Sequence, residues 1–254
     1  MYRVSCTASH VPRLIIFGKT TTMTNKEAII LAGGFGTRLQ GVVKDVPKPM
    51  ASVNGRPFLT YVLDYLIDYH YTKVVLSVGY LHEKVEEYFG NVYKSLEISY
   101  AVETEPLGTG GGIAYAMSFC KSDNVLVLNG DTLFKADLSA LERFHTDAQG
   151  TLSIVLRHVA DTSRYGSVST DENGRILRFT EKTNASGEGD INGGIYLINK
   201  KLLEEIPLPK KFSFEKDLME KYVCEMLFYA MRSDGYFIDI GIPEDYARAQ
   251  QEFV

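Results

Sequence analysis

The chain has 254 residues, of which 45% are hydrophobic and 23% are charged, a composition that suits one globular domain with a substantial core. A net charge of -5 argues against a nucleic-acid surface, and no apolar run approaches the ~20 residues that span a membrane. Three widely spaced cysteines form neither a disulfide framework nor a metal-binding pattern, which favours a reducing, cytoplasmic location.

Residues 1–24 do not share the pattern of the rest of the chain. The apolar run Val11–Phe17 is too short for a transmembrane helix, and no convincing signal-peptide cleavage site follows it. We therefore expect residues 1–24 to be a non-functional extension and residues 25–254 to form a single domain. A weak targeting segment is the alternative.

The first predicted strand, Ala28–Leu31, leads directly into a glycine-rich loop. The loop contains Gly33, Gly34, Gly36, Thr37 and Arg38. Glycines at this point let backbone N–H groups approach an anion, and arginine adds a planar charge that suits phosphate oxygens. Lys48 follows between two prolines, which stiffen the backbone that presents its ammonium group. The stretch predicts a polyphosphate site, although it matches neither the P-loop nor the dinucleotide fingerprint.

Predicted helices and strands alternate through the first 150 residues. The helices are Pro57–Tyr69, His82–Phe89, Gly110–Phe119 and one capped by Asp137, and the strands are Lys73–Val78, Leu96–Val102 and Val125–Leu128. This alternation predicts a doubly wound, Rossmann-like, mainly parallel sheet.

The pattern changes after Gly150, where strands follow one another. We predict strands over Thr151–His158, Gly166–Thr170, Arg175–Thr180, Gly193–Ile198, Met226–Met231 and Tyr236–Ile240, with helices over Ser213–Tyr222 and Pro243–Phe253. The whole is expected to be one α/β domain with a mixed sheet, whose second half supplies a small antiparallel lid.

Several candidate ligand-binding residues come just after predicted parallel strands. They are Gly33, Gly79, Glu103 and Asp131. Ligands bind at this edge of open α/β sheets, and a carboxylate there can hold Mg²⁺ together with phosphate oxygens and water. Asp239, at the end of the last predicted strand, is a second candidate. The alternatives are a turn aspartate at 131 and a helix-entry carboxylate at 239.

Eight short motifs extend the pattern over almost the whole of residues 27–253. They are GGFGTRL, PKP, EPLGTG (105–110), NGD (129–131), YG (165–166), FTEK (179–182), NGG (192–194) and DIG (239–241). Their content and order resemble the sugar-phosphate nucleotidyltransferases, which make nucleoside-diphosphate sugars from a nucleoside triphosphate and a sugar 1-phosphate. Within this family the sequence most resembles the D-glycero-D-manno-heptose 1-phosphate guanylyltransferases.

The resemblance implies a role for each matched residue. Arg38, Lys48 and Asp131 would be catalytic, and Asp131 and Asp239 would bind Mg²⁺. The nucleotide would be bound by Leu31, Gly33, Gly34, Gly36, Thr37, Glu103 and Gly108. The sugar would be bound by Gly166, Glu181, Lys182, Asn192 and Gly193. Thr183 and Ile242 depart from the family pattern, and both departures put the identity of the sugar in doubt.

Glu103 offers a physical reason for guanine, because a carboxylate can accept hydrogen bonds from the adjacent N1–H and N2 amino groups. A solvated glutamate at a strand end is the alternative. The sequence is also compatible with a mannose 1-phosphate guanylyltransferase, with a uridylyl- or thymidylyltransferase and with a nucleotide-sugar sensor. A glycosyltransferase is a further possibility, although neither Asp131 nor Asp239 completes the D-x-D motif usual in that class. The sequence leaves a homo-oligomer open.

Overall fold

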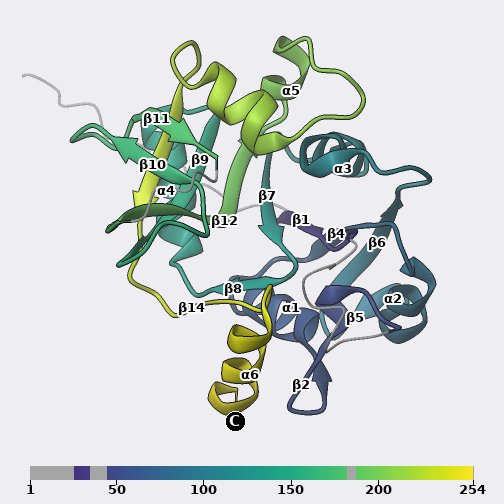
Figure 1. Cartoon of the computed structure of the whole chain (residues 1–254). Coiled ribbons are helices and arrows are strands. Elements are labelled where there is room, and N and C mark those ends of the chain that lie inside the picture. Colours follow the sequence, from purple (N-terminus) through teal and green to yellow (C-terminus); the bar gives the residue numbers. More distant parts are fainter. Residues whose placement is uncertain (1–25, 35–44, 182–186, 254) are drawn as a thin grey trace, which may run out of the picture.

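The computed structural model describes residues 26–34, 45–181 and 187–253, and its centre is one large mixed β-sheet (Figure 1). The strands of this sheet are β1 (Glu27–Leu31), β4 (Lys73–Val78), β5 (Val92–Tyr93), β6 (Leu96–Val102), β7 (Asn124–Asn129), β9 (Leu152–Val159), β10 (Ser167–Thr170), β11 (Ile176–Thr180), β12 (Gly189–Asn199) and β13 (Phe228–Arg232). The main path runs β11-β10-β12-β7-β1-β4-β6-β5, and β9 lies between β12 and β13. The predicted α/β class with a mixed sheet is confirmed.

The first half of the chain supplies the parallel part of the sheet. Strands β1, β4, β6 and β7 run parallel, and the helices of this half are α1 (Phe58–Asp68), α2 (His82–Phe89) and α3 (Gly108–Met117). In β1, Ala28 and Ile30 pack into the core cluster that contains α1. Ile29 points to the other face and packs with α3. The strand is therefore buried on both faces, as its uninterrupted apolar run predicts.

The second half extends the same sheet with antiparallel strands. Strand β12 pairs antiparallel with β7, β9 and β10, and β10 forms a hairpin with β11. A register shift between Asn192 and Tyr196 interrupts the pairing of β12 with β9. Along the other edge of β12, Ile191 pairs with β10 and residues from Ile195 onward pair with β7. The predicted antiparallel region is thus continuous with the parallel sheet through the β12–β7 contact.

Among the described residues, four further helices follow α3 along the chain. They are α4 (Leu138–Ala148), α5 (Lys201–Glu205), a π-helix (Phe214–Glu220) and α6 (Pro243–Glu252). Asp137 caps α4 as predicted, since its Oδ1 accepts a hydrogen bond from the Ala140 N–H at 3.0 Å.

Two small antiparallel sheets complete the fold. Strand β8 (Thr132–Phe134) pairs with β14 (Phe237–Asp239), and β2 (Ser52–Val53) pairs with β3 (Arg56–Pro57). The sequence predictions missed β8, β2 and β3, because two or three residues are too few to show the alternation of a strand. The β8–β14 pair matters most, since it places Asp239 opposite Thr132, the residue after Asp131.

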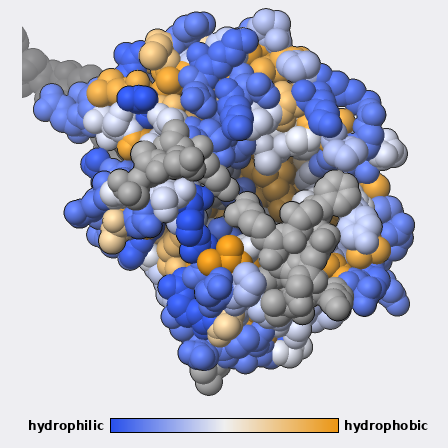
Figure 2. Space-filling model, viewed as in Figure 1, coloured by the Kyte–Doolittle hydropathy of each residue, from blue (hydrophilic) through white to orange (hydrophobic). Residues whose placement is uncertain are grey.

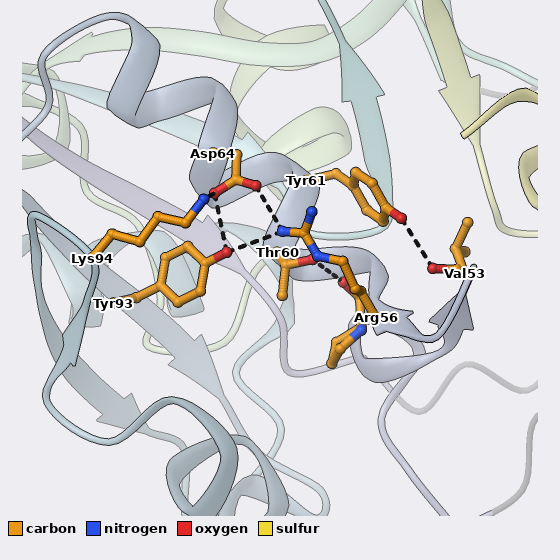
Figure 3. A network of polar contacts seen from close by, with 8 residues as sticks. Val53, Arg56, Thr60, Tyr61, Asp64, Tyr93 and Lys94 are labelled. Atoms are coloured by element: carbon orange, nitrogen blue, oxygen red, sulfur yellow. Dashed lines mark hydrogen bonds and ion pairs between the residues drawn. The ribbon is translucent and has the colours of Figure 1, made fainter. Parts of the chain in front are cut away.

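A polar network fixes the β2–β3 hairpin to the sheet (Figure 3). Asp64 of α1 accepts hydrogen bonds from Arg56 at 2.7 Å, Lys94 at 2.6 Å and Tyr93 at 3.0 Å. Burial acts to raise the pKa of Asp64, but these hydrogen bonds outweigh it and lower the pKa. The network anchors the segment that directly follows Lys48.

No helix among the described residues has the length and apolarity that crossing a membrane needs.

Candidate active site

A cavity of about 680 Å³ opens where the parallel strands β1, β4, β6 and β7 end. Figure 2 shows a hollow on this face of the molecule, with hydrophobic residues in its depth. The predicted residues that line the cavity are Leu31, Gly33, Gly34, Lys48, Glu103, Gly108 and Asp131. Gly79, after β4, lines it as well, so predicted residues from the ends of β1, β4, β6 and β7 meet here, which is the placement that the sequence pattern predicts.

Two carboxylates and one lysine meet at one side of this cavity. The Lys48 ammonium forms an ion pair with Asp131 and lies 3.7 Å from Asp239 Oδ1. The β8–β14 pairing brings these segments together, and the Ile240 N–H also donates a hydrogen bond to the Asp131 carbonyl oxygen at 3.0 Å. Asp131 and Asp239 therefore do meet in space, a point that the sequence left open.

The electrostatics of this group favour a further cation. Burial raises the pKa of Asp239, and the nearby charge of Asp131 raises it further, while Lys48 acts in the opposite direction. A cation bound beside the two carboxylates would act in the same direction as Lys48 and favour the ionised form of Asp239.

Lys48 is held by its local backbone. It begins a short 3₁₀ helix, Lys48–Met50, in which the Met50 N–H donates to the Pro47 carbonyl oxygen at 2.8 Å. Pro49 and Met50 are buried, so the backbone on one side of Lys48 is fixed by packing. The lysine side chain is only 14% exposed and points to the carboxylates.

Gly130 allows the Asn129–Asp131 turn to pack tightly against both neighbours. A Cβ at this position would lie 2.7 Å from the Leu31 carbonyl oxygen and 3.3 Å from Pro49. The Gly130 N–H donates to that same carbonyl oxygen at 2.9 Å. A side chain here would push Asp131 away from the end of β1 and from the segment that carries Lys48.

Gly108 shapes the opposite side of the cavity, at the start of α3. Its φ of +75° is a conformation that favours glycine, and a Cβ would lie 2.5 Å from the Phe212 carbonyl oxygen. The loop that carries Gly108 is therefore held close to the segment that precedes the π-helix. Glu103, at the end of β6, lines the cavity beside this loop.

A second group of predicted residues gathers where β10, β11 and β12 meet. A Cβ on Gly166 would lie 3.3 Å from Glu181 Oε2, and the Asn192 N–H donates to the Gly166 carbonyl oxygen at 3.3 Å. The Asn192 side-chain amide also donates a hydrogen bond to the Tyr196 hydroxyl at 2.8 Å. Gly193 packs so closely that a Cβ would lie 2.5 Å from the Phe134 ring.

The comparison with known proteins assigns the family. The family model described as Nucleotidyl transferase matches residues 27–254. The chain belongs to the nucleotidyl transferase family. The predicted family resemblance is confirmed.

Individual relatives are similar to this nucleotidyl transferase over nearly their whole length. The chain is 47% identical over 226 residues to D-glycero-alpha-D-manno-heptose 1-phosphate guanylyltransferase of Aneurinibacillus thermoaerophilus, a match that covers 89% of this chain and 97% of that protein. It is 44% identical over 220 residues to the Campylobacter jejuni protein of the same name, with 87% and 96% covered. The crystal structure of HddC from Yersinia pseudotuberculosis complexed with GMP-PN is similar with a TM-score of 0.80 and 38% identity, covering 90% of this chain and all of that one.

Four predicted site residues of the nucleotidyl transferase lie outside the described residues. They are Gly36, Thr37, Arg38 and Lys182. Their roles in binding phosphate and sugar remain predictions.

Several further cavity residues were not predicted as part of the site. They include Ser77, Tyr80, Thr109, Glu215 and Gly241. Tyr80 follows the end of β4 as Gly33 follows β1, so the strand-end rule would have found it. Ser77 lies inside the apolar run of β4 and Glu215 inside a predicted helix, and neither has a sequence signal of its own.

The described residues contain no group of three or more histidine, cysteine or acidic side chains that could hold a metal by themselves. Mg²⁺ does not need such a group, because one or two carboxylates suffice when phosphate oxygens and water fill its other positions. Asp131 and Asp239 fit this requirement in number, type and placement.

Proposed function

We propose that this nucleotidyl transferase transfers GMP from GTP to D-glycero-D-manno-heptose 1-phosphate and releases pyrophosphate. The convergence of Asp131, Lys48 and Asp239 at the strand-end cavity is the observation that carries the reaction. The choice of substrates is supported by the guanylyltransferases of two species, which match this chain over almost their full lengths.

In the proposed reaction, an oxygen of the sugar phosphate attacks the α-phosphorus of GTP in line. The new P–O bond forms as the bond from the α-phosphorus to the bridging oxygen breaks, and pyrophosphate leaves with that electron pair. The attacking phosphate is already anionic, so the reaction needs no general base. Catalysis then depends on positioning and on neutralising charge at the phosphates.

The residues of this chain divide that work. Lys48 would bind the transferring phosphoryl group, and Arg38 would bind the same phosphates. Asp131 and Asp239 would hold Mg²⁺, which supplies positive charge to the phosphate oxygens when bound. Glu103 and Gly108 would face the base, while Gly166, Glu181 and Asn192 would form the sugar side.

The decisive experiment is a matrix of triphosphates against sugar 1-phosphates, scored by pyrophosphate release. We expect the highest kcat/KM for GTP with D-glycero-D-manno-heptose 1-phosphate. Higher values with mannose 1-phosphate, or with UTP or dTTP, would overturn the assigned sugar or base. Asp131→Asn serves as the control for release that does not come from this site.

A further inference from the structure

The carboxylate of Glu103 is held on both of its oxygens. The Ser77 hydroxyl donates a hydrogen bond to Oε1 at 3.0 Å, and the Leu107 N–H donates to Oε2 at 3.0 Å. Ser77 is 1% exposed and lies on β4, whereas Glu103 follows β6 and Leu107 precedes α3. Three separate elements therefore set the orientation of one side chain at the cavity wall.

Close packing restricts the same carboxylate. A Cβ added to Gly112 of α3 would lie 2.7 Å from Glu103 Oε1 and 3.1 Å from the Ser77 hydroxyl oxygen. A Cβ on Gly33 would lie 3.6 Å from Oε1. Oε1 thus occupies a narrow space between α3, the end of β4 and the loop after β1, and it cannot turn far without losing Ser77.

The arrangement leaves acceptor capacity on both oxygens. A carboxylate oxygen can accept two hydrogen bonds, and among the described residues each Glu103 oxygen accepts one. Both residues of the Ser77–Glu103 pair line the cavity. A ligand with two adjacent donors can therefore bind both remaining positions, provided that the carboxylate keeps its orientation.

We propose that Ser77 is a positioning residue for base choice: its hydroxyl and the Leu107 N–H orient Glu103 to accept both the N1–H and the N2 amino group of guanine. The inference rests on the proposed guanylyltransferase function. A carboxylate fixed in advance binds the base without losing rotamer freedom at that moment. Without the Ser77 hydroxyl, the Glu103 side chain can adopt other rotamers. The carboxylate then distinguishes less well between a base with two adjacent donors and a base with one.

Inosine triphosphate is the sharpest probe, because it differs from GTP only by lacking the N2 amino group. For the full chain we expect kcat/KM to favour GTP over ITP by about 10- to 100-fold, as for a hydrogen bond to a charged acceptor. Ser77→Ala should lower this ratio by about 3- to 10-fold. The change should come mainly from a higher KM for GTP, because the base lies away from the reacting phosphorus.

Gly112→Ala is an independent variant, because alanine favours the helix while its methyl group displaces Glu103 Oε1. It too should lower the GTP/ITP ratio. The matched control is Ser153→Ala, which removes an equally buried hydroxyl that bonds His145 at 2.8 Å, outside the site. This control should keep the ratio of the unmodified chain.

An unchanged ratio in Ser77→Ala, or an equal loss for GTP and ITP, would overturn the inference and assign Ser77 a purely structural role. A ratio unaffected by Glu103→Gln would overturn it as well. Failure of the proposed function is a separate result, because the unmodified chain would then prefer another triphosphate in the substrate matrix.

Discussion

Replacing Lys48 with methionine would remove the cation between the two carboxylates of the site and keep a side chain of similar length. Lys48 is 14% exposed and lies 3.7 Å from Asp239 Oδ1, besides its ion pair with Asp131. At an effective dielectric constant of ~20, unit charges about 4 Å apart attract by about 4 kcal/mol before solvation is counted. Desolvation offsets much of this attraction, and both carboxylates keep contact with water. We therefore expect the unfolding free energy to change by only about 1–2 kcal/mol.

The same substitution should affect catalysis and metal binding in opposite directions. The kcat should fall by about 10²- to 10³-fold, the usual effect of removing a charge that acts on the transition state, and KM should change less. The substrate-free protein should bind Mn²⁺, as a probe for Mg²⁺, about 5- to 30-fold more tightly, which corresponds to ~1–2 kcal/mol. Tighter binding is expected because the carboxylates no longer share their charge with an ammonium group.

The two effects can be measured separately, by pyrophosphate release and by calorimetric Mn²⁺ titration without substrates. The control is Lys94→Met, because Lys94 also pairs with a carboxylate, Asp64 at 2.6 Å, but is 57% exposed and outside the cavity. It should leave both kcat and Mn²⁺ affinity unchanged. Weaker Mn²⁺ binding in Lys48→Met, or a kcat within threefold of normal, would refute the reasoning.

Three further changes test other parts of the structure. Asp131→Asn should lower kcat at saturating Mg²⁺ by at least about 100-fold. The thermal midpoint should change little, since a strand-end carboxylate supports little packing. A near-normal kcat would reject Asp131 as a metal ligand. Gly193→Ala should lower the unfolding free energy in urea by about 1–3 kcal/mol, because its Cβ would lie 2.5 Å from Phe134 and 2.9 Å from the Val155 carbonyl oxygen; an unchanged midpoint would contradict this. Burial lowers the pKa of His145. The neutral ring therefore contributes fully to stability above the unfolded-state pKa of about 6.5, and this contribution is lost as the pH falls below that value, because the unfolded chain then binds the proton more readily. Unfolding free energies at pH 7.5 and 5 should therefore differ less in His145→Asn than in the unmodified chain, and equal differences would count against the burial effect.

Elements with a strong local pattern could be predicted from the sequence. The apolar run of β1 and the predicted helix Pro57–Tyr69, which forms as α1, each point to one structure, and both form within one residue of their expected bounds. The segment after Ser213 shows the limit of this reasoning. Ser213 caps it as a helix should be capped, yet the turns are those of a π-helix, and seven residues are too few for a pattern to distinguish the two periods.

The candidate site was predictable only in part, because its geometry depends on long-range pairing. Each strand-end residue could be placed at the edge of the sheet from its own neighbourhood. That Lys48 lies between Asp131 and Asp239 could not, since Lys48 and Asp131 are 83 residues apart and no local pattern records their contact. The Ser77–Glu103 contact is of the same kind, because a serine within a buried strand looks identical whether or not a carboxylate faces it.

Apolar packing outside the cavity maintains the geometry of the carboxylates. The β8–β14 pair has only three residues in each strand, too few for its hydrogen bonds to keep the strands together alone. Within the pair, Leu133 and Ile238 are opposite each other and both buried, and the rings of Phe134 and Phe237 pack edge to face with centroids 5.4 Å apart. Phe134 also lies against Gly193, within the register shift of β12. Since β8 follows Asp131 and β14 ends at Asp239, one apolar cluster sets the distance between the carboxylates and joins them to the strand proposed to bind the sugar.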